Sequence, residues 1–225
     1  MKRTSWPMLG AALITAIVLD GSSVLAQQPA PQGGSNLTPA EQAKADSGRP
    51  PFTAADVHFM QGMIMHHTQA VIMAQWAPTH GARPDVIRLC ERINVAQRDE
   101  IVFMQRWLKE RHQVVPEANF TDWHAGLGMA SMPGMPAMGA MPGMLTADQM
   151  TKLEAAQGPD FDRLFLVDMI QHHTGALTMV NDLFESEGAG QDGDIFKFAS
   201  DVGADQTAEI GRMELMLTAP AAPGQ

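Results

Sequence analysis

One pattern that occurs twice constrains the fold of this chain more than any other feature. Residues 56–73 read DVHFMQGMIMHHTQAVIM, and residues 162–179 read DRLFLVDMIQHHTGALTM. Without gaps, Asp, Phe, Met-Ile, His-His-Thr, Ala and Met recur at the same positions, 106 residues apart. A second pair of segments, AQRDEIVFM (96–104) and DQTAEIGRM (205–213), recurs with an offset of 109. Internal repetition of this kind indicates two copies of one structural unit.

The first copy predicts two antiparallel helices. Thr53 with Asp56 resembles a capping box and starts a helix whose apolar positions recur every three or four residues as far as Trp76. Pro78 and Gly81 follow it, and a second helix is expected from Pro84 to about residue 111. Because the connecting loop is short, the two helices should be antiparallel neighbours.

The second copy predicts the same arrangement. Thr146 with Gln149 caps a short helix that we expect to end at Gly158-Pro159. Long helices should follow from about 160 to 187 and from about 194 to 217. Two helical hairpins can bury their apolar stripes only against each other, so the predicted fold is an all-α four-helix bundle.

The ends of the chain and its middle have other expected roles. Residues 1–26 combine a positive start, an apolar run of twelve residues and small residues up to Ala26, which is typical of a signal peptide and too short to span a membrane. The mature protein should therefore be periplasmic or secreted. The expected division of the chain is a signal peptide (1–26), a flexible leader (27–50), a bundle domain (51–217) with repeat units 53–112 and 160–217 and a Met-rich linker (113–145), and a tail (218–225).

Charge and cysteine content exclude several classes of partner and of stabilisation. The formal net charge of −10 argues against binding to nucleic acid or anionic lipid. The single cysteine, Cys90, cannot form an intramolecular disulfide, and its apolar surroundings predict a small buried hydrophobe.

The repeated pattern places possible metal ligands on one face of each long helix. At 100° per residue, the first set covers an arc of about 140° together with Met60 and the small residue Ala70. Histidine and methionine are ligands that a soft metal ion prefers, and metal sites in bundles are built from facing helices. The candidate metal ligands are Met63, His66, His67 and Met73 in the first unit, and Met169, His172, His173 and Met179 in the second.

The spacing also indicates which metal is expected. Carboxylate-bridged di-iron bundles use Glu-x-x-His, whereas here a methionine stands three residues before the histidine, at Met63 and Met169. Replacement of a hard carboxylate by a neutral thioether favours Cu(I), and the similar Ag(I), over iron or manganese. Glu100 and Glu209 occupy equivalent places on the second helices, where they are either partners of the imidazoles or solvated charges.

Further methionines could take part. Six of them stand at every third position in the linker, where they serve either as a plain linker or as a flexible site that recruits Cu(I) with modest affinity. The possible accessory metal ligands are Met60, Met104, Met213, Met129, Met132, Met135, Met138, Met141 and Met144.

These motifs resemble the domain-of-unknown-function 305 family. The resemblance rests on the double M-I-x-H-H-T-x-A-x-x-M pattern, the E-I-x-x-M helices and Met-Pro-Gly-Met before Leu-Thr-x-x-Gln, and covers roughly residues 50–217. It implies a secreted or periplasmic ferritin-like four-helix bundle, similar to the CopM-type copper-binding proteins associated with copper resistance. Within the first unit, Gly62 departs from the second unit, which has a carboxylate, Asp168, at that position.

Three functions remain open on sequence grounds. The favoured one is a protein without catalytic activity that sequesters Cu(I) or passes it to other copper-handling proteins. The alternatives are a ferritin-like di-metal redox enzyme and a helical interaction module with structural His-His pairs. The absence of Glu-x-x-His pairs counts against the enzyme, and the repeated Met-x-x-His counts against a plain scaffold.

Overall fold

The computed structural model describes residues 38, 40, 41, 44, 47, 48, 51–123 and 141–218, all within one compact unit that extends from residue 33 to 225. The helices whose bounds fall within these residues are α2 (Ala54–Trp76), α3 (Pro84–Glu110), α5 (Ala147–Ala155), α6 (Gly158–Glu185) and α7 (Gly193–Thr218). None of the described residues is in a strand, so the prediction of an all-α fold is confirmed.

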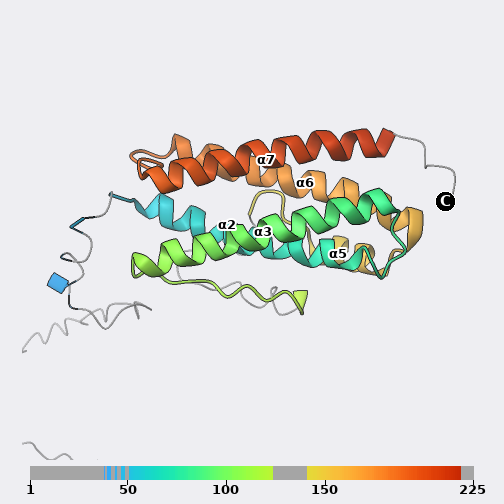
Figure 1. Cartoon of the computed structure of the whole chain (residues 1–225), viewed down its shortest axis with the longest axis horizontal. Coiled ribbons are helices and arrows are strands. Elements are labelled where there is room, and N and C mark those ends of the chain that lie inside the picture. Colours follow the sequence, from blue (N-terminus) through green and yellow to red (C-terminus); the bar gives the residue numbers. More distant parts are fainter. Residues whose placement is uncertain are drawn as a thin grey trace, which may run out of the picture. The chain divides into compact units, whose positions relative to one another are not determined.

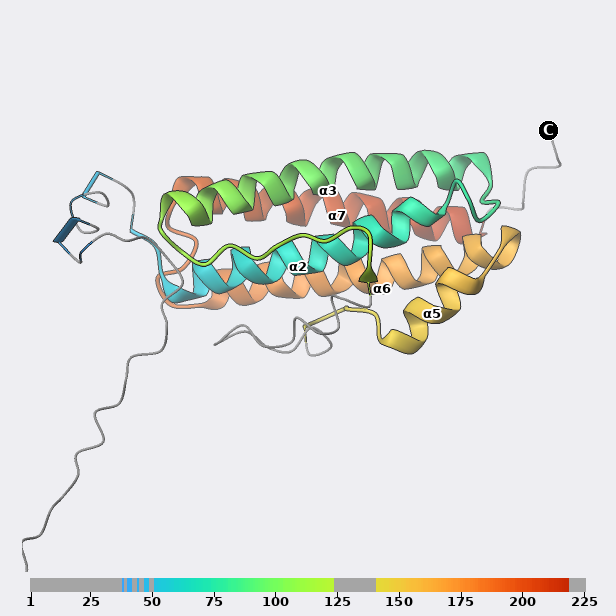
Figure 2. The ribbon, with the colours of Figure 1, turned by 90° about the horizontal axis from the view of Figure 1, so that it is seen from below.

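Four long helices lie side by side as two hairpins, α2–α3 and α6–α7, and the shorter α5 crosses near α2 and α6 (Figures 1 and 2). The hairpins meet along α2 and α6, the two helices that carry the repeated His-His pattern. This arrangement agrees with a four-helix bundle, and its ferritin-like character stays a prediction. No described helix combines the length and apolar character needed to cross a membrane.

Local sequence signals set the helix ends. Both predicted capping boxes are present, at Thr53 with Asp56 and at Thr146 with Gln149. The expected end of α5 at Gly158-Pro159 was wrong, because α5 ends at Ala155 and those two residues open α6. Gly158 adopts a φ of 57°, which is favourable for glycine, and Pro159 fits the first turn because that turn needs no N–H donor.

Helix α2 is buried on nearly every side, from Asp56 to Ala74 apart from His58. A helix that is apolar all round belongs in an interior, and here the chain itself supplies the cover. The segment after α3 runs back along α2 (Figure 2), and Gln61 Nε2 donates to Val114 O at 2.8 Å. The sequence predicted that one apolar stripe of α2 would be buried, whereas the structure buries nearly the whole helix surface.

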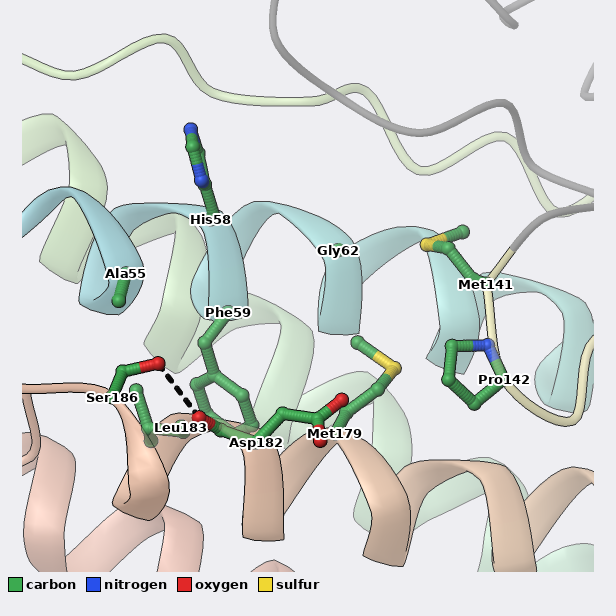
Figure 3. Close-up of a pocket in the computed structure, with 10 residues that line it drawn as sticks. All are labelled: Ala55, His58, Phe59, Gly62, Met141, Pro142, Met179, Asp182, Leu183 and Ser186. Carbon is green, nitrogen blue, oxygen red and sulfur yellow. Dashed lines mark hydrogen bonds between the residues drawn. The ribbon is translucent and has the colours of Figure 1, made fainter.

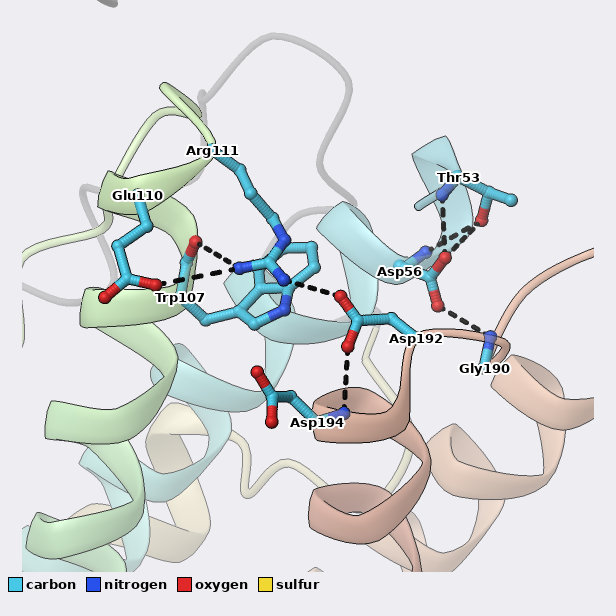
Figure 4. Close-up of polar contacts among 8 residues, drawn as sticks. All are labelled: Thr53, Asp56, Trp107, Glu110, Arg111, Gly190, Asp192 and Asp194. Atoms are coloured by element: carbon cyan, nitrogen blue, oxygen red, sulfur yellow. Dashed lines mark hydrogen bonds and ion pairs between the residues drawn. The ribbon is translucent and has the colours of Figure 1, made fainter. Parts of the chain in front are cut away.

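The repeated aspartates tie each hairpin to the loop of the other hairpin. Asp56, at the start of α2, accepts a hydrogen bond from Gly190 N at 2.7 Å, in the α6–α7 loop (Figure 4). Its counterpart Asp162, near the start of α6, accepts from Arg83 N at 3.2 and 3.3 Å, in the α2–α3 loop. Burial raises the pKa of Asp162, and the hydrogen bond from Arg83 N acts in the opposite direction.

A buried ion pair joins the two hairpins at the end of the bundle where Asp56 contacts Gly190 (Figure 4). Arg111 Nη2 lies 2.5 Å from Asp192 Oδ2, and both side chains are almost fully buried (Figure 4). The guanidinium also lies over the ring of Trp107. Asp192 Oδ1 accepts a further hydrogen bond from Asp194 N, so the carboxylate has partners on both oxygens.

Candidate metal centre

The four repeated histidines lie in the interior of the bundle, and His66, His67, His172 and His173 are all 0% exposed. Helix α2 supplies one pair and α6 the other, because the His-His pattern occupies the face that each helix turns toward the bundle. The rings of His66 and His172 meet across the α2–α6 interface, with centroids 3.8 Å apart and planes inclined by 39°. The sequence repeat thus becomes one shared layer of imidazoles.

In three of these imidazoles, Nε2 lies close to an acceptor oxygen. His66 Nε2 lies 3.1 Å from the carbonyl oxygen of Pro142. His173 Nε2 bonds Glu209 Oε2 at 2.7 Å, and His67 Nε2 lies 2.7 Å from Glu100 Oε2, although its alignment falls short of a hydrogen bond. Glu100 and Glu209 therefore contact the imidazoles from α3 and α7, the first of the two roles considered above.

These contacts determine which nitrogen of each ring is free. A carbonyl or carboxylate oxygen accepts only from N–H, so Nε2 of His66 and of His173 is the donor, and Nδ1 of each ring makes no hydrogen bond. Nδ1 of His66, His67 and His173 has no partner among the described residues, and neither nitrogen of His172 has one. Because His67 Nε2 also lacks a hydrogen bond, the site contains six buried imidazole nitrogens without one.

Burial lowers the pKa of the two imidazoles that face each other, His66 and His172. The pKa of His66 falls from the ordinary 6.5 to about 3, chiefly through burial and secondarily through the neighbouring His67. The pKa of His172 lies well below the ordinary value, again through burial first and then through the nearby histidines. Neutral imidazole is the form that binds metal, so His66 and His172 are in their ligand form at neutral pH.

The predicted thioether ligands occupy different environments. Those that are fully buried in the core are Met60, Met63, Met73, Met104, Met169 and Met213. Met179 is only partly buried and lines a groove between α2 and α6, whereas its repeat counterpart Met73 is 0% exposed. Met63 and Met169 lie one helical turn before His66 and His172, which is the spacing that puts two side chains on the same face.

A short segment covers the imidazole layer from one side, and we call residues 141–145 the strap. Pro142 O is the acceptor for His66, and Gln69 bonds both the N–H and the carbonyl of Leu145, at 2.8 and 3.2 Å. On α6, the strap packs directly on Gly175, where an added Cβ would lie 2.1 Å from Pro142 O. The strap is therefore held by both helices that carry the histidines.

Solvent approaches the carboxylates from the opposite side. A cleft of about 190 Å³ between α3 and α7 is lined by Glu100 and Glu209, together with Asp205 and Arg212. Burial raises the pKa of Asp205, and the charges of Glu100 and Glu209 add to this rise. Each glutamate therefore contacts a buried imidazole and also borders the cleft.

Two buried glutamines belong to the same repeat and were missed by sequence reasoning. Gln97 on α3 and Gln206 on α7 are each 3% exposed, and no amide atom of either has a partner among the described residues. Both lie three residues before the glutamate that contacts a histidine. The signal was available, because they align in the segments that recur with an offset of 109. The contact with Pro142 O had no sequence signal, since a carbonyl belongs to every residue.

Part of the linker comb lies outside the described residues, namely Met129, Met132, Met135 and Met138. Its last two members, Met141 and Met144, are described and lie in the strap, buried against Met65 of α2. No group of three or more His, Cys, Asp and Glu side chains in the described part of the chain is arranged to hold a metal ion. A site here would therefore combine few imidazole nitrogens with thioethers.

Comparison with known proteins gives a consistent result. The model of the family described as domain of unknown function 305 (DUF305) matches residues 56–217. A DUF305 protein from Streptomyces coelicolor, described as a predicted secreted protein, is 26% identical, with a TM-score of 0.58 over 72% of this chain and 91% of its own. No protein of curated function matches the chain.

Two further solved structures are forms of CopM with copper bound. The Cu(II)-bound form is 26% identical, with a TM-score of 0.53 over 72% of this chain and 95% of its own. The Cu(I)-bound form is 28% identical, with a TM-score of 0.50 over 74% of this chain and 96% of its own.

Proposed function

This chain belongs to the DUF305 family, whose model matches residues 56–217. On that basis we propose that it is a metal-binding protein. The chain binds Cu(I), and the chemically similar Ag(I), in the core of its helical bundle. The ligands are a few of the buried imidazole nitrogens, above all those of the facing pair His66 and His172, together with the thioethers of Met63 and Met169 one turn away. The protein sequesters or transfers the ion outside the cytoplasm and performs no catalysis.

The observation that carries the proposal is the set of free imidazole nitrogens in a dry interior. A buried polar atom without a hydrogen bond costs about 1–3 kcal/mol, and here six such atoms come from four rings. An imidazole that binds a metal characteristically gives its other N–H to a carboxylate or a carbonyl, which fixes the ring. His66 with Pro142 O and His173 with Glu209 have this arrangement, and each leaves Nδ1 available.

The chemistry of these ligands favours a monovalent soft ion. Neutral imidazole and neutral thioether leave the charge of a buried ion uncompensated, so a single positive charge costs less to bury than a double one. Hard ions such as Mg(II) and Mn(II) need several oxygen ligands, whereas the groups that face each other across the α2–α6 interface are the imidazoles of His66 and His172. The copper-bound forms of CopM support binding of copper by a chain of this fold.

A role in copper homeostasis or resistance fits the remaining features. Residues 1–26 have the pattern of a signal peptide, which supports a location of the mature chain outside the cytoplasm. A binding protein in that compartment can lower the free Cu(I) concentration or deliver the ion to another copper-handling protein.

The test is an anaerobic titration of Cu(I) against a competing chelator. We expect the double variant His66→Ala/His172→Ala to lose the tight class of binding, with affinity reduced more than tenfold. The matched control His58→Ala removes an exposed histidine of α2 and should bind as the wild type does. Unchanged affinity in a double variant that retains its helical circular dichroism would contradict the proposal and leave the histidines as core packing.

A further inference from the structure

Three methionines form a cluster of their own, apart from the two large hydrophobic clusters of the bundle. They are Met65 of α2 and Met141 and Met144 of the strap, each 6% exposed. At 100° per residue, Met65 lies about 200° from Met63, on the side of α2 that faces away from the histidines. The cluster is therefore distinct from the imidazole layer.

The strap fixes the two linker methionines against α2. Gln69 holds Leu145 through two hydrogen bonds, and Gln171 Nε2 donates to Gly143 O at 3.3 Å. Gly143 adopts a φ of 74° and lies against the backbone of Gly175 so closely that neither position has room for a side chain. Two thioethers are thus presented by a backbone that is fixed at both ends, which reduces the entropy lost on binding an ion.

The composition of the cluster is unusual for packing alone. Leucine, isoleucine and valine fill the two main clusters together with methionine, whereas this one contains methionine only. Thioether sulfur is a soft neutral ligand, and three of them suit Cu(I) and Ag(I) while discriminating against Zn(II), Cu(II) and harder ions. Sulfur also remains a ligand at low pH, because it does not take up a proton.

A groove leads from solvent to one member of the cluster, Met141. This groove, of about 310 Å³, lies between α2 and α6 and is lined by Pro142 and Met179 as well (Figure 3). The thioether of Met179 points toward Pro142 and Met141, whereas the ring of His58 points away from α6 (Figure 3). The groove therefore gives access to Met141 on the outer side of the strap, while Pro142 O contacts His66 on the inner side.

We infer that Met65, Met141 and Met144 form a second Cu(I) site, made of thioethers alone, on the outer side of the strap. The inference rests on the proposed function in that it takes Cu(I) as the ion the protein handles. It adds a peripheral site of lower affinity that shares the strap with the imidazole layer. An ion held there lies one residue from Pro142, whose carbonyl is bonded to the buried His66.

The experiment compares full mature chains that differ only in methionine. We expect Met65→Leu/Met141→Leu/Met144→Leu, which preserves side-chain volume, to bind one Cu(I) equivalent fewer in an anaerobic titration with a chelator of modest affinity. The matched control is Met150→Leu, a fully buried methionine of α5 outside the cluster, and it should keep the wild-type stoichiometry. Circular dichroism checks that each variant is folded.

A second measurement uses the wild-type protein and so does not depend on the folding of a variant. In wild-type protein with ¹³C-labelled methionine methyl groups, Ag(I) should shift the Met65, Met141 and Met144 resonances together, and they should saturate as one site. Met150 should stay in place. Unmoved resonances, or an unchanged stoichiometry in the triple Leu variant, would overturn the inference.

The His66→Ala/His172→Ala variant separates this inference from the proposed function. If the thioether site exists, the shift of the three methionine resonances persists in that variant while the tight binding class is lost. Loss of the tight class without any methionine shift supports the proposed function and refutes the second site. Methionine shifts with unchanged tight binding in the His variant would refute the core site alone.

Discussion

His66 of α2 and His172 of α6 face each other across the interface of the two hairpins, with ring centroids 3.8 Å apart. Each ring comes from the same position of a different repeat unit, so the site is made of two halves. His66 has an acceptor on Nε2, whereas His172 has no partner on either nitrogen among the described residues. The pair is therefore symmetric in sequence but not in its surroundings.

The glutamates that contact the histidines should tune the affinity without carrying it. Glu100→Gln or Glu209→Gln weakens the hold on His67 or His173 and makes the ring a poorer ligand, so we expect Cu(I) affinity to fall about tenfold or more. The measurement is competition with a Cu(I) chelator. Glu214→Gln, an exposed carboxylate of α7, is the matched control and should have no effect. Equal affinities for all three variants would mean that the glutamates only solvate the cleft.

A methyl group at Gly175 should disturb the strap. Its Cβ would lie 2.1 Å from Pro142 O, so Gly175→Ala must displace the strap and lengthen the contact between Pro142 and His66. We expect the free energy of unfolding to fall by about 1–3 kcal/mol in denaturant titrations, as for other overpacked sites. Gly211→Ala is the control, because nothing lies within 4 Å of its Cβ, and it should raise stability by about 0.5–1 kcal/mol. A similar gain for both variants would show that the strap is not fixed on α6.

The stability of the metal-free protein should depend on pH through its buried histidines. In the unfolded chain His66 takes up a proton below about pH 6.5, whereas in the folded protein its pKa is about 3. The unfolded state therefore binds more protons between these values, and stability falls as the pH decreases from 6.5 toward 3. His172 acts in the same direction, because its pKa is lowered as well.

The buried carboxyls act in the opposite sense, since burial raises the pKa values of Asp162 and Asp168 and favours the folded state on acidification. Comparison with His66→Ala/His172→Ala removes this contribution, because both proteins retain the two aspartates. Unfolding titrations between pH 7.5 and 5.5 should show a smaller loss of stability in the variant than in the wild type. The same slope in both proteins would contradict the low pKa values of the histidines.

The ion pair between the hairpins should be costly to break. Asp192→Ala leaves Arg111 charged and 3% exposed without its carboxylate, and we expect a loss of about 3–5 kcal/mol in the free energy of unfolding. Asp201→Ala removes an exposed partner of Lys197 on α7 and should cost less than about 1 kcal/mol. Comparable losses in the two variants would show that the guanidinium finds another partner.

The sequence predicted the parts of this structure that depend on local chemistry. Capping boxes at Thr53 and Thr146 marked helix starts, and the spacing of apolar residues predicted the long helices, because both signals act within one turn. The end of α5 was misplaced because Gly-Pro is compatible with either the end or the beginning of a helix, and backbone conformation at Gly158 decided between them.

Tertiary contacts explain the rest. The burial of α2 on all sides requires the returning chain, whose contact between Gln61 and Val114 has no local signature. Glu100 and Glu209 were placed at equivalent positions, but their contacts with His67 and His173 depend on how the helices are rotated. Met65 was passed over because it lies opposite the histidines, and only the path of the strap brings Met141 and Met144 to it.

The two repeats differ at positions that contact the strap. Gln69 in the first unit corresponds to Gly175 in the second, and Met65 corresponds to Gln171; all four contact the strap. A chain assembled from two copies of the first unit would carry glutamine in place of Gly175, and Pro142 would meet a side chain where it now meets hydrogen. The glycine at position 175 therefore lets the strap pack on α6, and the two repeat units cannot be exchanged for each other.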